Sequence, residues 1–193
     1  MILIFFILSI ITALLRNGKI KRLSYLKFRS IWLFILAMVI QLSIVVFGAT
    51  GSYYILKYIK ELYIGSYVLL FIGLIINIKY KPIIIIMLGG LMNVFCFMAN
   101  DGKMPISIEG LKLAGFDNLI RLIQNGKIAL YTPLNGATNY GQFAQLITVQ
   151  KPFPLPQILS IGDIIIYIGI FVLVQVVMLN SDMDRLISRK PRY

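Results

Sequence analysis

The chain has 193 residues, of which 59% are hydrophobic and 13% are charged, whereas soluble domains have about 45–50% apolar and about 25% charged residues. This composition predicts an integral membrane protein, so the net charge of +12 indicates membrane topology and attraction to anionic lipid rather than nucleic-acid binding. The single cysteine, Cys96, excludes an internal disulfide, and the absence of histidine argues against imidazole-dependent catalysis and metal binding. We therefore expect no metal site and no cofactor.

The first apolar stretch, residues 2–15, is short for a transmembrane helix. A secretory signal peptide carries positive charge before its apolar run and small residues after it. Here the basic residues follow the run instead, beginning with Arg16 and Lys19. This order favours a retained N-terminal helix over a cleaved signal, and the length leaves both a full span and an interfacial helix open.

Four further apolar stretches have the length of membrane spans: 31–48, 62–78, 83–99 and 161–179. They are rich in Leu, Ile, Val and Phe, and Asp163 is the one charged residue among them. At about 1.5 Å per residue, each covers about 25–29 Å, close to the bilayer's hydrocarbon thickness of about 30 Å. The predicted fold class is an all-α integral membrane protein, with about five transmembrane helices in one domain, 1–193.

The distribution of Lys and Arg predicts the orientation of these helices. Basic residues are densest in 16–30, in 79–82 and in the tail 180–193, which we therefore expect on the cytoplasmic side. The N-terminus and the long segment 100–160 then lie outside, and the C-terminus is cytoplasmic. The expected location is a bacterial cell membrane.

Residues 100–160 contain no span and are predicted to form an outer cap of a short amphipathic helix and extended segments. Ser107 is expected to cap a helical turn, and Asp117 to cap a helix over 118–125 that ends at Gly126. We expect the apolar side of this second helix to lie on lipid or on the bundle, with partner binding as the alternative. The prolines of KPFPLPQ predict extended chain.

The first candidate site lies where the fourth apolar stretch ends, in NVFCFMANDGKMPIS. Asn93, Cys96 and Asn100 share a helical face with Gly89, and this face should point into the bundle. The Asn-Asp-Gly sequence that follows is typical of a turn with glycine at positive φ. A turn alone explains this composition; in the alternative, a ligand or partner binds the residues Asn100, Asp101, Gly102, Lys103, Met104 and Pro105.

The second candidate site is at the start of the last apolar stretch. Ser160 and Asp163 have the spacing of a capping box, and the helix dipole favours a carboxylate in the first turn. Asp163 is also a candidate functional carboxylate, because ionisable groups in membrane helices are costly. Gly162 and Gly169 predict a smooth face for close helix packing. The other polar residues in the apolar stretches are expected to form interhelical hydrogen bonds: Gln41, Ser43, Asn77 and Gln175.

Three stretches, ANDGKMPIS, EGLKLAG and KPFPLPQILSIGDIIIYIGIFVL, resemble a family of small multi-span membrane proteins of clostridia and related bacteria, domain of unknown function 5317. The family pattern is an Asn-Gly-Gly-x-Met-Pro-like turn after one span, then a Pro-rich approach to Ser-x-Gly-Asp at the last span. Covering most of the chain, the resemblance has two departures: Asp101 replaces a frequent Gly, and a His near residue 128 is missing. It implies a membrane architecture, names no reaction and singles out Asn100, Gly102, Met104, Pro105, Ser160, Gly162 and Asp163.

Polar and turn-forming residues gather on the outer side without catalytic motifs, which predicts a non-enzymatic accessory or sensory protein with a ligand or partner site there. One alternative is a small transporter subunit with a polar path lined by Asn93, Asn100, Asp163 and Gln175. Another is an intramembrane enzyme that uses Asp101 and Asp163 as an acid and base pair in one pocket. The expected partners are membrane lipid and a membrane protein or second copy of the chain, but no nucleic acid.

Overall fold

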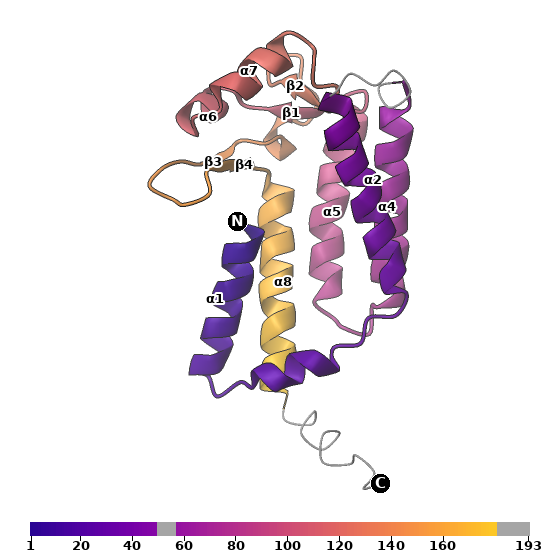
Figure 1. The fold of residues 1–193 in the computed structure, drawn as a ribbon, viewed down its shortest axis with the longest axis vertical. Helices are drawn as coiled ribbons and strands as arrows, with labels where there is room; N and C mark the ends of the chain where they lie inside the picture. The colour runs from indigo at the N-terminus through magenta and orange to yellow at the C-terminus, as the bar shows by residue number, and fades with distance from the viewer. Residues whose placement is uncertain (50–56, 181–193) are drawn as a thin grey trace, which may run out of the picture.

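The computed structural model describes residues 1–49 and 57–180, and its longest helices run side by side beneath a folded cap (Figure 1). The fold is mostly helical, as predicted. The long apolar helices of the described residues are α1 (Ile2–Leu15), α2 (Ile31–Ala49), α4 (Ile59–Ile76), α5 (Ile83–Ala99) and α8 (Ile161–Leu179). Most of the predicted tail, 181–193, falls outside the described residues.

The apolar stretches predicted the helix boundaries closely. Helices α1, α5 and α8 match the expected ranges, and α2 extends one residue further. Helix α4 begins at Ile59 and ends at Ile76, whereas the prediction was 62–78. Its extra first turn carries Glu61, which the helix dipole favours. Its end is set by Asn77, whose side-chain amide donates to the Gly73 carbonyl oxygen at 2.7 Å.

Two helices in the described residues are long and apolar enough to cross a membrane, judged by length and composition. They are α4, with 18 residues, and α8, with 19. Shorter apolar helical stretches accompany them: α1 over Ile2–Leu15, α5 over Ile83–Ala99, and the part of α2 over Ile31–Phe47. Length and composition therefore support two candidate spans directly.

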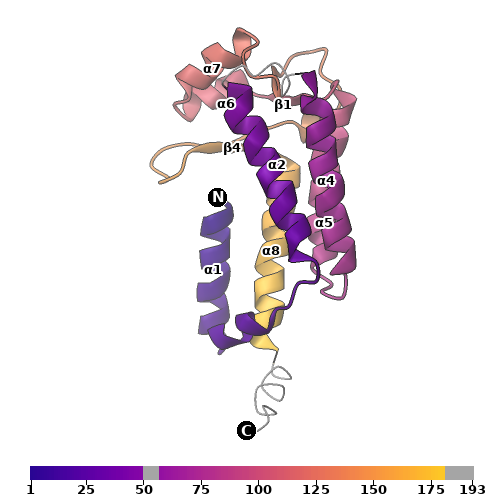
Figure 2. The same cartoon turned by 45° about the vertical axis from the view of Figure 1, so that its right-hand side comes forward.

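The long helices form two groups. Helix α8 packs against α5 on one side and α1 on the other, while α2 packs against α4 (Figures 1 and 2). Contacts between α4 and α5 join the two groups and are much fewer. The predicted hydrogen bonds occur within each group: Gln41 donates to Ser66 Oγ across α2 and α4 at 3.2 Å, and Gln175 donates to the Ser9 carbonyl across α8 and α1 at 2.7 Å. Ser43 instead bonds within its own helix, to Val39.

The end opposite the cap is closed by η1 (Ile20–Tyr25), a 3₁₀ helix that packs against the last turn of α8. The Arg22 guanidinium donates to the Met178 carbonyl oxygen at 2.7 Å. Further along, the Arg29 amide donates to Asn77 Oδ1 at 2.7 Å, and Asn77 Nδ2 returns a bond to the Arg29 carbonyl at 2.9 Å. Two segments that are distant in sequence therefore hold this connection in place.

Short strands in the cap correct the all-α prediction. β1 (Met104–Ile106) pairs in parallel with β2 (Tyr131–Pro133), and β3 (Ile147–Val149) pairs antiparallel with β4 (Gln157–Leu159). Each strand has three residues, too few to show an alternating pattern. The partner of β1 follows it in the sequence only after α6 and α7, whereas β3 and β4 are the two sides of one loop. Pro105 favours extended chain before it, but helical periodicity carries no information on strand pairing.

The cap also contains α6 (Ile108–Leu113), η2 (Gly141–Phe143) and α7 (Asp117–Gln124), and it has its own apolar core. The apolar side of α7 packs into this core through Phe116, Leu119 and Ile120. Leu119 also lines a pocket with Ile44 of α2 and Ile59 of α4, so this side of α7 faces the bundle as well, one of the two expected positions. The core is formed by Ile106, Leu111, Ile123 and Ile158. The cap is thus a folded unit rather than a set of segments spread on a surface.

The expected capping residues have different outcomes. Ser107 Oγ accepts from the Gly110 amide at 3.0 Å, which confirms the cap of α6. Asp117 is the first residue of α7 rather than its cap, and Phe116 holds the N-cap position without a side-chain hydrogen bond. Gly126 follows α7 with φ of 66°, as expected for a helix stop.

The prolines of residues 151–156 do not form the straight extended segment that we predicted. They form the loop between β3 and β4, which projects sideways from the cap (Figures 1 and 2). The antiparallel pairing of these strands forces the chain to reverse here. Phe153 and Leu155 are exposed in the loop.

Candidate functional site

A polar junction connects α5 to the start of α8. The Asn93 side-chain amide donates to Asp163 Oδ1 at 2.8 Å, and the Ser160 hydroxyl donates to Asn93 Oδ1 at 2.7 Å. Ser160 Oγ also accepts from the Asp163 amide at 2.9 Å, while Asp163 Oδ2 accepts from the Ser160 amide at 2.9 Å. These bonds confirm the predicted capping box of Ser160 and Asp163. They also join Asn93 of α5 to it.

Glycine residues allow α5 and α8 to approach each other closely at the junction. A methyl group placed on Gly162 would lie 2.6 Å from the Gly89 carbonyl oxygen and closer still to Asn93 Oδ1. A methyl group on Gly169 would lie 2.6 Å from Ile86 Cγ1. The predicted packing face of Gly162 and Gly169 is therefore confirmed, because α5 approaches α8 too closely for any side chain at these positions.

The contacts of the junction are those of a structural link. Ser160 and Asn93 are buried, and both carboxylate oxygens of Asp163 accept hydrogen bonds from neighbouring groups. Asp163 also influences the cap: burial raises the pKa of the Tyr131 phenol, and the negative charge of Asp163 acts in the same direction. A phenol whose pKa is raised stays neutral at ordinary pH.

The turn after α5 attaches the cap to the bundle. Asn100 Nδ2 donates to the Cys96 carbonyl at 2.8 Å and to the Asn139 carbonyl at 2.9 Å. The Asn139 amide donates back to Asn100 Oδ1 at 3.0 Å. Asp101 and Gly102 have φ of 55° and 77°, as expected for an Asn-Asp-Gly turn. This turn fixes one cap loop against the end of α5.

Beside this turn is an open polar pocket with a volume of about 280 Å³. One wall comes from the turn after α5, and the other from the loop after β2. The second wall is stiffened by Asn135 Oδ1, which accepts from the Ala137 amide at 2.9 Å. We call this the outer pocket; it is lined by Asn100, Asp101, Lys103, Thr132, Pro133, Asn135, Ala137, Thr138 and Asn139.

Asp101 and Lys103 are exposed and bring opposite charges to the outer pocket. Within residues 1–49 and 57–180, neither side chain has a hydrogen-bond or ion-pair partner. Both groups are therefore available to a molecule in the pocket. Charge-assisted hydrogen bonds are stronger than those between neutral groups, so such a pair can orient a small charged solute.

A smaller pocket of about 200 Å³ lies under the cap, between α2, α4 and the strands. Gln41, Tyr63, Tyr131 and Gln145 contribute its polar groups. Met104, which the sequence singled out, lines this pocket from β1 rather than the outer pocket. Pro105 is buried and its carbonyl accepts from the Gln145 amide at 2.9 Å, so its position in the structure is that of a strand residue.

The structure divides the sequence-predicted residues between separate places. Asn100, Asp101 and Lys103 meet at the outer pocket. Four others meet at the junction: Asn93, Ser160, Gly162 and Asp163. Gly102 packs on neither, because its Cα faces the Lys60 side chain, where an added methyl group would lie 2.7 Å from Lys60 Cγ.

This division corrects two expected arrangements. Gln175 bonds to α1, Asn100 to Asn139, and Asn93 to Asp163, so the four residues of the expected polar path form three separate contacts. Asp101 lines the outer pocket, whereas the carboxylate of Asp163 is bonded to Asn93 and Ser160, so the two acids do not share one pocket.

The sequence reading did not identify the far wall of the outer pocket. Asn139 and Thr138 come from a segment in which only the turn signals Thr132-Pro133 and Asn135-Gly136 stand out. Among the described residues, no group of three or more His, Cys, Asp or Glu side chains could hold a metal ion. The outer pocket presents the charged side chains of Asp101 and Lys103 together with amide and hydroxyl groups.

Comparison with known proteins identifies sequences similar to most of the chain. Residues 25–175 match the model of a family described as Family of unknown function (DUF5317). The chain is also 28% identical over 170 residues to an uncharacterized protein of Thermotoga maritima, which covers 88% of this chain and 85% of the relative. No solved structure matches the chain significantly. Because the family model matches well over half of the sequence, the chain belongs to the DUF5317 family.

Proposed function

We propose that this protein is a multi-pass protein of a bacterial cell membrane, with its five long apolar helices embedded in the bilayer and its cap on the outer side. The observation that supports this arrangement is the apolar surface of the helices themselves. Large exposed hydrophobic side chains occur on all five, among them Phe6, Trp32, Ile72, Phe95 and Ile168. Soluble monomers rarely expose contiguous apolar patches of this extent.

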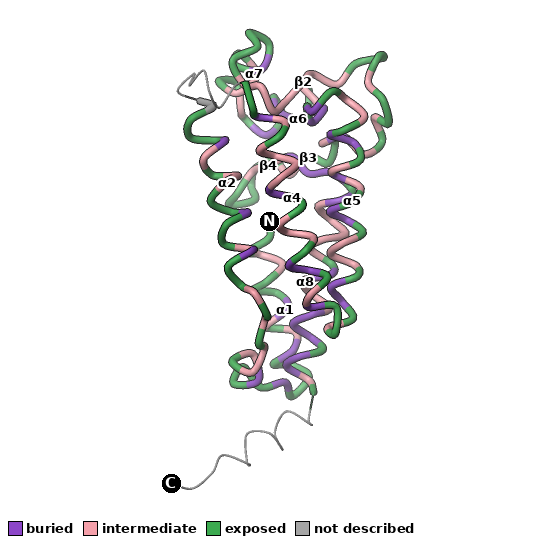
Figure 3. Tube along the Cα trace, turned by 90° about the vertical axis from the view of Figure 1, so that its right-hand side faces the viewer, coloured by how far each residue is buried: buried purple, intermediate pink, exposed green. Residues whose placement is uncertain are grey.

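Figure 3 shows exposed positions running along α2 and α5, away from the helices they pack on. Lipid chains are as apolar as these side chains, so a bilayer removes this surface from water without any further protein. The basic residues at the end opposite the cap support the orientation, since cytoplasmic loops carry an excess of Lys and Arg. The N-terminus is then outside and the C-terminus is cytoplasmic.

A cysteine-labelling experiment tests the orientation. The natural cysteine is replaced by alanine (Cys96→Ala), and single cysteines are introduced by Asn118→Cys in the cap and Ser24→Cys at the opposite end. Both positions are exposed. A membrane-impermeant maleimide applied to intact cells should label the cap cysteine, and should label the other only after permeabilisation. The reverse pattern, or equal labelling of both, contradicts the proposed topology.

We further propose that the cap has a non-enzymatic, sensory or accessory role and binds a small zwitterion in the outer pocket. The supporting observation is a pair of opposite charges, Asp101 and Lys103, in a polar pocket of about 280 Å³, neither of which has a partner among the residues that the structure describes. Asp101 would accept from an ammonium group, and Lys103 would donate to a carboxylate. The amides and hydroxyls of the far wall offer further hydrogen bonds.

The position of the pocket suggests how binding affects the membrane helices. Asn100 is the C-cap of α5 and also lines the pocket, so a ligand there contacts the residue that directly follows a long helix. The close contact of Gly89 with Gly162 couples movements of α5 to α8. A ligand shifts such an equilibrium only by its difference in affinity for the two arrangements.

Thermal unfolding of the detergent-purified protein tests ligand binding, with a panel of zwitterionic, anionic, cationic and uncharged polar solutes. A solute at 100 times its dissociation constant stabilises the folded state by about 2.7 kcal/mol. We expect stabilisation by zwitterions in the wild type, and its loss in Asp101→Asn and Lys103→Gln. Lys127→Gln is the matched control, because Lys127 is an exposed cap lysine outside the pocket. Stabilisation that persists in both pocket variants contradicts the proposed site.

A further inference from the structure

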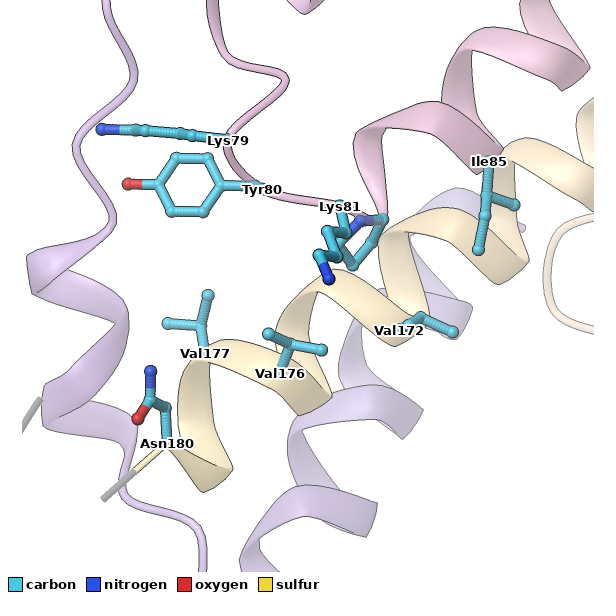
Figure 4. A pocket seen from close by; sticks show the side chains of 9 residues that line it. Lys79, Tyr80, Lys81, Ile85, Val172, Val176, Val177 and Asn180 are labelled. Atoms are coloured by element: carbon cyan, nitrogen blue, oxygen red, sulfur yellow. The ribbon is translucent and has the colours of Figure 1, made fainter. Parts of the chain in front are cut away.

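A second large cavity lies at the end of the molecule opposite the cap (Figure 4). Its volume is about 580 Å³, and it opens between the connection from α4 to α5 and the last turns of α8. Neither the outer pocket nor the junction includes any of its residues. The cavity is therefore separate from both of these regions.

The walls of this cavity divide into an apolar part and a cationic rim. Ile85 of α5 and Val172 and Val176 of α8 form the apolar part. Lys79 and Lys81 stand at the rim, and both are exposed. Figure 4 shows Lys81 above the valines of α8, while Lys79 extends along the Tyr80 ring. The Lys79 ammonium lies 4.9 Å from the centre of that ring.

The two rim lysines have no carboxylate partner within residues 1–49 and 57–180. A small inorganic anion would pair with their charges but would leave the apolar wall in contact with water. A neutral lipid would cover the apolar wall but would leave both ammonium groups without a counter-ion. A ligand that satisfies both parts carries a negative headgroup and a hydrocarbon chain.

We infer that this cavity binds one anionic phospholipid of the leaflet next to the basic end of the molecule. Its phosphate lies at Lys79 and Lys81, and one acyl chain lies along Ile85, Val172 and Val176. The inference rests on the proposed membrane location, because that location brings the cavity to the height of lipid headgroups. Anionic lipids of the cytoplasmic leaflet attract basic residues at the membrane surface.

The lipid site has a structural consequence for the helices around it. The cavity lies between the start of α5 and the end of α8, and η1 is bonded to the same end of α8 through the Met178 carbonyl. A lipid seated here would join the α4–α5 connection to α8 where protein contacts leave a gap. It would therefore hold the α4–α5 connection, which links the two helix groups, against the end of α8.

Native mass spectrometry of the full chain in detergent tests this inference, with added dioleoyl phosphatidylglycerol or dioleoyl phosphatidylcholine. The wild type should bind phosphatidylglycerol more tightly. The double variant Lys79→Gln/Lys81→Gln should weaken that binding about 25-fold, since each lysine near an anionic surface contributes about fivefold. Val176→Phe tests the apolar wall separately, and should weaken binding by filling the space of the acyl chain.

The matched control is Lys21→Gln/Lys27→Gln, which removes two exposed lysines from the same end of the molecule but outside the cavity. Phosphatidylglycerol binding should stay within about twofold of the wild type in this control. Equal losses of phosphatidylglycerol binding in the two double variants would contradict the lipid site. They would mean that the basic surface attracts anionic lipid in general. Soluble glycerol phosphate is a competitor that should not displace the lipid; displacement would mean that the cavity binds phosphate alone.

The outcome is distinguishable from failure of the proposed membrane location. If maleimide labelling confirms the topology but phosphatidylglycerol and phosphatidylcholine bind equally, the lipid site is wrong and the membrane location stands. If Val176→Phe unfolds the chain, thermal unfolding without lipid reveals it, and the lysine variants, whose side chains are exposed, still decide the question.

Discussion

Two regions of the molecule, the α5–α8 junction and the outer pocket, contain the same kinds of residues but place them in different environments. Both contain Asn and Asp next to glycine, and both stood out in the sequence as candidate sites. In the junction, each carboxylate oxygen of Asp163 has a partner, and glycine removes the space a ligand would need. In the outer pocket, Asp101 and Lys103 have no partner within the described part of the chain. Availability of the charged group, rather than its residue type, separates a structural link from a pocket that we propose as a binding site.

The largest effect should come from adding a methyl group to the junction. Gly162→Ala places that group against the Gly89 carbonyl and the Asn93 side chain, and overpacking of this kind costs about 1–3 kcal/mol. Gly65→Ala is the control, because nothing lies within 4 Å of a methyl group there. Thermal unfolding in detergent should show a lower midpoint for the first and an unchanged or higher one for the second. Equal midpoints would mean that the helices are not in close contact.

Asp163→Asn should produce the next largest loss. An amide nitrogen would replace one oxygen and face either the Asn93 amide or the Ser160 amide, both of which are donors. A buried group left without its hydrogen bond costs about 1–3 kcal/mol. The loss should not add to that of Asn93→Ala, because the two residues share one bond. Additive losses would argue against the Asn93–Asp163 contact.

By comparison, Asp117→Asn in the first turn of α7 should lower the unfolding free energy by about 0.5 kcal/mol.

Asn100→Ala should affect both stability and binding, since Asn100 belongs to the turn and also lines the outer pocket. The lost bonds to Asn139 and Cys96 should lower stability by about 1–2 kcal/mol. Any solute that stabilises the wild type should stabilise this variant less. Asn139→Ala serves as a comparison, because it removes the bond from Asn139 Nδ2 to the Ala99 carbonyl at 3.0 Å but keeps the backbone groups that bond Asn100. If the solute stabilises both variants as much as the wild type, the turn does not contribute to binding in the outer pocket.

The smallest change in stability should come from the charged residues of the pocket. Asp101→Asn and Lys103→Gln remove exposed groups without partners, so the unfolding free energy should change by less than about 0.5 kcal/mol. Asparagine also tolerates the positive φ of position 101. The same variants should abolish zwitterion binding. A large loss of unfolding free energy in either variant, measured without solute, would reveal a structural role for Asp101 or Lys103. The outer pocket would then not differ from the junction in this respect.

The sequence allowed accurate prediction of features that depend on neighbouring residues. The apolar runs gave the helix ends, and Ser160 with Asp163 gave a capping box, because three residues of spacing suffice to form one. The partner of that box, Asn93, lies 70 residues away. Asn100 meets Asn139 across 39 residues. β1 pairs with β2, which follows it in the sequence only after α6 and α7. Such pairings depend on how the chain folds back, so a single sequence offered no signal for them.

The unequal lengths of α1 and α8 have a consequence for the surrounding bilayer. Helix α1 has 14 residues and α8 has 19, or about 21 Å and about 28 Å at 1.5 Å per residue. Figures 1 and 2 both show the loop between β3 and β4, with its exposed Phe153 and Leu155, just above the start of α1. In the proposed arrangement, this loop supplies apolar surface at the height that α1 does not reach. Hydrophobic mismatch is then confined to one flank, and shorter lipid chains should gather there.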